Sequence, residues 1–270
     1  ECPILITVDD SPVTQDAGVY NYDITTNISQ LLLSDPGYTF SDVSYWKTNT
    51  SHLIFTYHAS IIKEWEVTTG NLPVLNRTIN LGQTIGKGLT NINQLRLLAC
   101  DSWCGGCINE IDLINATSTT ANITPLFGLP GNSRVTGDIV YDPSSNLMLI
   151  LYSKDYGHWN PLKTKHLGKF DYNGNLVEDY LIPTILSGNT ATEEFSGIIC
   201  NVVSDSIGLG KYVTSESGFV FEIIESPTLS IAPAPIHMNQ VLDNIGSTNN
   251  VTGAEGKCGC KIKVPETYDC

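Results

Sequence analysis

One segment of the 270-residue chain gathers side chains suited to recognition, in a stretch too long for a tight turn. Ser153–Thr164 holds Asp155, Tyr156, His158 and Trp159, and runs of strand-forming residues flank it on both sides. Tyr and Trp present flat apolar surfaces with polar tips, which suit contact with sugars or proteins. Loops of this length are usually functional or mobile. The segment is therefore the main candidate for a binding surface, and the alternative is that Trp159 caps the core beneath it.

The cysteines form a second group with chemical potential. Cys100, Cys104 and Cys107 are close in sequence, and their spacing superficially resembles a zinc site. The even total fits four disulfide bridges, and a bridge from Cys100 to Cys107 would close a predicted hairpin. In an oxidising compartment bridges are favoured over a zinc site. The full set is Cys2, Cys100, Cys104, Cys107, Cys200, Cys258, Cys260 and Cys270.

Glycosylation sequons supply the evidence for that compartment. A single N-x-S/T match means little in a chain rich in Asn and Thr, but several beside eight cysteines indicate the eukaryotic secretory pathway. The predicted acceptors are Asn27, Asn49, Asn76, Asn115, Asn122 and Asn250. No apolar run is long enough for a transmembrane helix. Because the chain begins at Glu1-Cys2 and ends on Cys270, we expect a secreted product whose leader was removed, with a cell-surface location as the alternative.

The charge excludes some partners. The chain carries 28 acidic residues against 14 Lys and Arg, a net charge of −14. Nucleic acid is an improbable partner, because phosphate contacts need clustered basic side chains. The charge serves solubility, and the alternative is a site for a divalent cation or a cationic ligand.

The elements that must position these residues are strands. Helical spacing is nearly absent, whereas alternating and β-branched runs recur. The clearest unit begins with Gly137–Tyr141 and Leu147–Tyr152. It continues with His166–Tyr172, the hairpin signal Asn173-Gly174 and a fourth strand, Asn175–Leu181. The same four-strand order repeats every 45 to 50 residues or so, which is the range of propeller blades.

The unit resembles the blades of the NHL and SMP-30-like propeller superfamilies. The resemblance rests on the Asp142-Pro-Ser-Ser-Asn146 turn and on the run Phe170-Asp-Tyr-Asn-Gly-Asn-Leu176. It covers one blade well and the others loosely, and it implies a fold rather than a particular family.

The predicted fold is therefore all-β: a β-propeller of about five four-stranded blades, or six if the tail after Pro227 forms its own. The first blade lacks a first strand, so Asn239–Leu242 or the stretch from Ala254 would close the ring. Residues 1–235 would form the blades, and residues 236–270 the closing strand with a disulfide-pinned tail, in one domain. The alternative architecture is a pair of two-sheet β-sandwiches.

In a propeller, the loops between second and third strands share a face with the connections between blades. None of the assigned sequons falls clearly in such a loop, so this face would be free of glycans and suited to contact with a partner. Besides the 153–164 loop, this face would carry acidic residues and a tryptophan from three other blades. They are Asp9, Asp10, Asp16, Asp101, Trp103, Glu193, Glu194 and Glu216.

Two classes of function remain open. We favour an extracellular binding or structural module that contacts a protein or a carbohydrate, or that self-assembles. The proposed ligand-binding residues are Asp10, Asp101, Trp103, Asp155, Tyr156, His158 and Trp159. The alternative is a propeller hydrolase, either lactonase-like with a bound calcium ion and His158 as general base, or glycosidase-like with paired carboxylates. No catalytic signature motif supports it, and no cofactor other than calcium is suggested.

Overall fold

A computed structural model describes most of the chain. The described ranges are 4–9, 17–23, 26–35, 38, 40–48, 51–68, 71–101, 106–116, 121–143, 145–154, 164–183, 195–204, 208–215, 218–233, 236–237 and 250–256. Every regular element within them is a β-strand.

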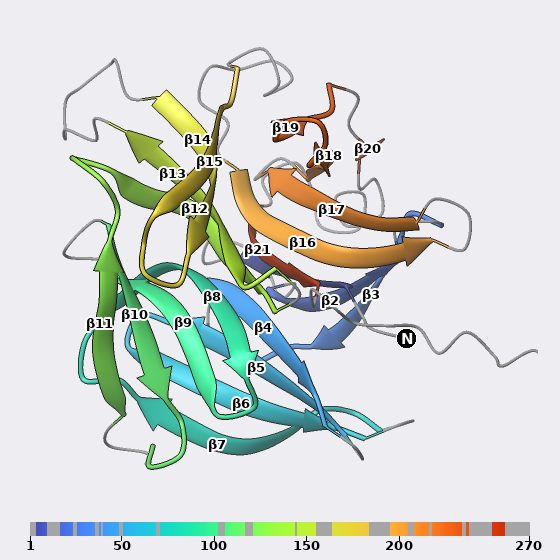
Figure 1. The fold of residues 1–270 in the computed structure, drawn as a ribbon. Coiled ribbons are helices and arrows are strands. Elements are labelled where there is room, and N and C mark those ends of the chain that lie inside the picture. Colours follow the sequence, from blue (N-terminus) through green and yellow to red (C-terminus); the bar gives the residue numbers. More distant parts are fainter. Residues whose placement is uncertain are drawn as a thin grey trace, which may run out of the picture.

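The strands form five antiparallel blades arranged in a ring, as Figure 1 shows. The propeller prediction is confirmed at five blades. Blade 2 contains β4 (Asp42–Lys47), β5 (His52–His58), β6 (Ile61–Val67) and β7 (Val74–Asn80). Blade 3 contains β8 (Ile85–Asn93), β9 (Arg96–Asp101), β10 (Cys107–Asp112) and β11 (Asn122–Gly128). Blade 4 contains β12 (Arg134–Asp142), β13 (Leu147–Lys154), β14 (Thr164–Asp171) and β15 (Leu176–Leu181).

The two ends of the chain share blade 1, as predicted. β21 (Asn250–Gly256) lies antiparallel to β1 (Ile4–Asp9), with Ile6 opposite Ala254. β2 (Gly18–Asp23) and β3 (Ile28–Leu33) complete the blade. The closing strand thus includes the predicted stretch from Ala254, while Asn239–Leu242 lies outside the described residues. β21 also runs parallel to the innermost strand of blade 5, which joins the first and last blades.

Blade 5 contains β16 (Phe195–Ser204), β17 (Gly208–Ser215), β18 (Phe219–Ile224) and the short strands β19 (Ser230–Ile231) and β20 (Ile236–His237). Both short strands pair with β18. The possibility of a sixth blade after Pro227 is therefore wrong, because the described strands of that tail complete blade 5 and close blade 1.

The hydrophobic core is divided among the interfaces between successive blades. The second strand of blade 4 shows why its sequence is apolar at every position. Met148, Ile150 and Tyr152 pack toward blade 3, whereas Leu149 and Leu151 pack toward blade 5. Because successive side chains of a strand point to opposite faces, a strand between two blades needs apolar residues on both.

The turn predicted from Asn173-Gly174 is present between β14 and β15. Gly174 has φ of 84°, a left-handed conformation that glycine adopts without strain. The Asp171 carboxylate accepts hydrogen bonds from the backbone amides of Asn173 at 2.9 Å and Asn175 at 2.8 Å. The turn therefore fixes where β15 begins along the outer edge of blade 4.

The predicted bridge between Cys100 and Cys107 is wrong, because the structure does not join these two sulfurs. Cys100 pairs with Ile108 across the β9–β10 hairpin. Cys107 is one residue earlier and so points to the other face of the sheet. Cys2, Cys104, Cys258, Cys260 and Cys270 lie outside the described residues.

Candidate functional site

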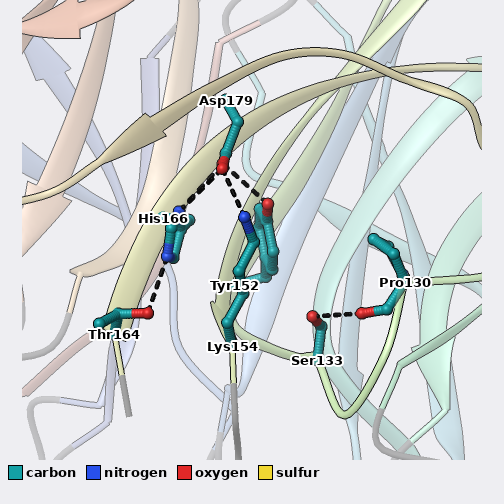
Figure 2. A network of polar contacts seen from close by, with 7 residues as sticks. All are labelled: Pro130, Ser133, Tyr152, Lys154, Thr164, His166 and Asp179. Atoms are coloured by element: carbon teal, nitrogen blue, oxygen red, sulfur yellow. Dashed lines mark hydrogen bonds and ion pairs between the residues drawn. The ribbon is translucent and has the colours of Figure 1, made fainter. Parts of the chain in front are cut away.

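The candidate site lies at the base of the predicted recognition loop on blade 4. Lys154 is the last residue of β13 and Thr164 is the first of β14, and the two are Cα partners across the sheet. Residues 155–163 between them, including Asp155, Tyr156, His158 and Trp159, lie outside the described residues. The contacts that Figure 2 draws among Tyr152, Lys154, Thr164, His166 and Asp179 therefore lie at the point from which this loop starts and to which it returns.

His166 is the centre of this network. Its Nδ1 lies 3.0 Å from Asp179 Oδ1, and its Nε2 lies 2.8 Å from Thr164 Oγ1. Only 8% of the His166 side chain is exposed. Both ring nitrogens thus have partners, and the partner of Nε2 belongs to the first residue after the loop (Figure 2).

Asp179 gathers three donors. It accepts hydrogen bonds from the Tyr152 hydroxyl at 2.8 Å and from Lys154 Nζ at 2.6 Å, in addition to its contact with His166. Burial raises the pKa of Asp179, but the hydrogen bonds from Lys154 and Tyr152, together with the charges of His166 and Lys154, outweigh burial, so its pKa lies below the ordinary value. Burial and the contact with Asp179 raise the pKa of Tyr152. Asp179 is therefore a carboxylate at neutral pH, and Tyr152 remains its donor.

The lack of a side chain at Gly168 allows Tyr152 to reach Asp179. Asp179 lies opposite Gly168 across β14 and β15, and Ile150 lies opposite Gly168 on the other side. A Cβ atom at Gly168 would lie 2.9 Å from Cε1 of Tyr152. Without a side chain there, the Tyr152 ring lies over the backbone of β14 and its hydroxyl reaches Asp179 on the next strand.

Thr164 contacts His166, and His166 contacts Asp179. The same sequence of hydrogen bonds links a nucleophile, a general base and an orienting carboxylate in a catalytic triad. The adjacent pocket is lined by Thr136, Tyr152, His166 and four other residues, and its volume is about 10 Å³. That is the space of a single water molecule. Lys154 also binds the carboxylate that would orient the base. The arrangement is thus better suited to holding the two ends of the loop than to transferring an acyl group.

A pair of buried acidic residues lies in the middle of the ring. Asp42 on β4 and Asp138 on β12 are 1% and 0% exposed, and their carboxyl groups are hydrogen-bonded to each other. Asp42 accepts from the Leu89 amide of blade 3 at 2.9 Å. Asp138 accepts from the Ile198 amide of blade 5 at 2.7 Å. Each carboxyl thus joins its own blade to the next one.

Burial raises the pKa of Asp138 to about 7, although hydrogen bonds from backbone amides and the contact with Asp42 act in the opposite direction. The pair therefore shares a proton over much of the acidic range. Because both groups are inaccessible and bonded to backbone, they do not provide the solvent-facing paired carboxylates that the glycosidase hypothesis required.

A half-open pocket of about 210 Å³ lies between blades 4 and 5. Lys169 contacts Glu178 at 3.2 Å and Glu225 at 3.1 Å, and Lys211 contacts Glu225 at 2.9 Å and Asp142 at 3.0 Å. Five charges thus alternate in this chain of ion pairs, all but Glu178 line the pocket, and the two lysines are largely buried. Each lysine is matched by carboxylates, so this chain of ion pairs ties blade 4 to blade 5.

The remaining predicted site residues are only partly described. Asp101 is the last residue of β9, and its side chain is not described. Asp10 and Trp103 lie outside the described residues. Within the described ranges, no group of three or more His, Cys, Asp or Glu side chains is placed to hold a metal ion. No helix in the same ranges is long and apolar enough to cross a membrane.

Sequence reasoning missed His166, Asp179 and the Asp42–Asp138 pair. His166 was expected only as part of a strand. The available signal was its place two residues after the long loop. The signal for the central pair was one position on the first strand of each blade, directly before an apolar residue. Blades 2 to 5 carry Asp42, Gly88, Asp138 and Gly197 there, so that Asp and Gly alternate around the ring.

No family model matches the sequence, and no curated protein matches it. Among solved structures, a chain of a nidogen/laminin complex is similar at 12% identity and a TM-score of 0.51, over 96% of this chain and 100% of that chain. The β-propeller domain of Myceliophteria thermophila Cps50 (Swd1) is similar at 13% identity and a TM-score of 0.46, over 88% and 72% of the two chains. A putative 6-phosphogluconolactonase of Bacteroides fragilis is similar at 14% identity and a TM-score of 0.44, over 88% and 67%. At these identities the similarity concerns the fold.

Proposed function

We propose that this propeller is a secreted, N-glycosylated and disulfide-bonded binding module whose contact surface lies on blade 4 and the neighbouring part of blade 5. The observation that carries the proposal is the distribution of sequons. Five fall between Asn27 and Asn122, in or next to blades 1–3, and the sixth is Asn250 at the start of β21. No N-x-S/T occurs between residues 123 and 249. Glycans would therefore cover one side of the ring and leave the other accessible.

The described acceptors support this division. Asn76 on β7, Asn122 on β11 and Asn115 in the segment after β10 are all exposed, and Asn27 lies in the turn before β3. Asn49 lies outside the described residues, and the side chain of Asn250 is not described. On the sequon-free side, the His166 network anchors the loop that carries Tyr156 and Trp159. An anchored loop loses less conformational freedom on binding, which favours affinity.

The cysteines fit the same proposal. β16 runs parallel to β21 with Ile199 opposite Gly256. Cys200 therefore lies on β16 next to the point where the chain continues toward Cys258 and Cys260. A bridge from Cys200 to either one would fasten the closing strand to blade 5 and would stabilise the ring by about 2–4 kcal/mol.

The proposal is tested by binding of the secreted glycoprotein to two probes, a glycan array and immobilised laminin, the latter chosen because the similar chain comes from a nidogen/laminin complex. We expect binding to at least one probe. Trp159→Ala should weaken it about tenfold or more, because such an aromatic anchor contributes 2 kcal/mol or so. Asp179→Asn, which replaces one acceptor oxygen by an amide donor at the base of the loop, should weaken it less.

The matched control is Glu66→Gln, a partly exposed carboxylate on β6 of blade 2, outside the proposed surface. It should bind as the unmodified protein does. The proposal is wrong if neither probe binds, or if Trp159→Ala and Asp179→Asn bind as tightly as Glu66→Gln.

A further inference from the structure

The outermost strand of each blade leaves one edge without a neighbouring strand among the described residues. β3, β7, β11 and β15 end their sheets in blades 1 to 4. Such an edge presents rows of backbone donors and acceptors and is a template for pairing with another chain, so proteins usually protect it.

Three of these edges carry sequons. Asn27 immediately precedes β3, Asn76 lies within β7, and Asn122 is the first residue of β11. A glycan at any of these positions would occupy the space that an added strand needs. β15 has no sequon, although it is as long as β3 and exposes three large apolar side chains. Leu176, Val177 and Leu181 are 39%, 58% and 54% exposed.

The outward-facing backbone groups of β15 follow from its pairing with β14. The Ile182 amide donates to Lys165 O at 2.9 Å, and this residue directly follows β15. Because inward and outward amides alternate along an antiparallel strand, the amides of Asp179 and Leu181 point away from β14. The pairing shifts by one residue at Val177, so two donors follow as outward-facing beside the exposed apolar side chains.

The charge indicates which occupant fits. β15 carries Glu178 and Asp179 at its centre, and the whole chain has a net charge of −14. A second copy would bring two chains of the same acidic charge together, which is unfavourable. Glu178 and Asp179 are already paired with Lys169 and Lys154. An extended segment with alternating apolar and basic residues would therefore be attracted by the acidic excess of the whole chain. β15 is also continuous with the loop site, because Asp179 belongs to both.

We propose that the outer edge of β15 is a strand-addition site for a basic, extended segment of a partner protein. Added main-chain hydrogen bonds supply affinity in this mode of recognition, and alternate side chains supply specificity. The inference deepens the proposed function, on which it rests, by naming the edge and the kind of partner that the sequon-free side would bind.

The test uses a defined probe, a ten-residue peptide of alternating Val and Lys, and the secreted glycoprotein. We expect saturable binding, with slowed hydrogen exchange at the amides of Asp179 and Leu181. A peptide of alternating Val and Glu should bind at least about tenfold more weakly. Protection of another edge, or equal affinity for the two peptides, would overturn the proposal, as would a stable dimer in sedimentation experiments without peptide.

A single substitution can shield this edge in the same way as the other three. Val177→Thr completes an N-x-T sequon at Asn175, the residue immediately before β15. The glycosylated variant should bind the Val–Lys peptide at least about tenfold more weakly, and enzymatic trimming of the glycan should restore binding. Restoration shows that the variant is folded. Unchanged binding by the glycosylated form contradicts the proposal.

The matched control adds a glycan to blade 3. Leu95→Thr completes an N-x-T sequon at Asn93, the exposed last residue of β8 before the turn to β9, and it should not alter peptide binding. Failure of the edge proposal is thus distinguishable from failure of the proposed function, which is measured on the glycan array and laminin.

Discussion

Replacing Asp138 with Ala is expected to lower the free energy of unfolding by about 3–5 kcal/mol. The substitution removes the acceptor of the Ile139 amide at 2.6 Å and of the Ile198 amide at 2.7 Å. Each buried donor left without a partner costs about 1–3 kcal/mol, and the vacated space adds to the loss. Urea denaturation monitored by tryptophan fluorescence measures the difference. Asp138→Asn is the matched variant, because its carboxamide oxygen can still accept from Ile198 in a side chain of the same shape.

A comparison of the native protein with Asp138→Asn also shows how protonation of this group changes stability with pH. The folded-state pKa of Asp138 is raised to about 7 by burial, from an ordinary value of 3.8. The folded chain therefore holds a proton that the unfolded chain releases between these values. The stability contributed by this group is complete below about pH 4 and decreases as pH rises to about 7.

Other groups act in the opposite direction. The pKa values of Glu225 and Asp179 are lowered, so their contribution is present above their ordinary pKa and is lost as pH falls from there through the lowered values. Asp42 and Tyr57 lie near Asp138, Cys100 lies near Tyr57, and all three remain in both proteins. The difference between the native and Asp138→Asn stability curves should therefore change between about pH 4 and 7. A constant difference across that range would contradict the shared-proton description of the central pair.

Gly88→Ala is expected to destabilise the ring by about 3 kcal/mol or more. Gly88 has φ of 93°, which side chains other than glycine rarely adopt, and its Cβ would lie 2.9 Å from the backbone nitrogen of Ile139 on blade 4. The left-handed conformation alone costs roughly 1–2 kcal/mol. The collision with Ile139 adds strain that β8 and β12 can relieve only by moving apart, which would disturb the contacts beside Asp138.

Gly82→Ala provides the control for this prediction. Gly82 also has a positive φ, 70°, but a Cβ atom added there would meet no atom within 4 Å. It should show the conformational cost without the collision, about 1–2 kcal/mol. Thermal unfolding of both variants distinguishes the two contributions. Equal destabilisation by Gly82→Ala and Gly88→Ala would mean that the inner strands of blades 3 and 4 are not in close contact.

Sequence patterns predicted the fold because the propeller imposes local rules on every blade. Strands such as Leu147–Tyr152 are apolar throughout because both faces are covered, and the Asn173-Gly174 turn needs a left-handed residue. The closing strand was harder to identify. Residues 250–256, of sequence Asn-Val-Thr-Gly-Ala-Glu-Gly, have few large apolar side chains, so their role follows from the pairing with β1 rather than from a pattern.

The candidate site was only partly predictable for a different physical reason. The aromatic loop is visible in sequence because its composition is unusual, whereas the network beneath it depends on register. Asp179 meets His166 because the turn at Gly174 fixes the alignment of β15 with β14, and Tyr152 reaches Asp179 because residue 168 is glycine. A diagonal contact across three strands has no signature in a linear sequence.

The central claim is that glycans cover the edges of blades 1–3 and leave blades 4 and 5 accessible. Its most direct test is glycopeptide mass spectrometry of the chain secreted from eukaryotic cells. The account predicts a folded, secreted protein with glycans at Asn27, Asn76 and Asn122, the positions that shield β3, β7 and β11. A folded and secreted chain with these three asparagines unmodified would contradict it.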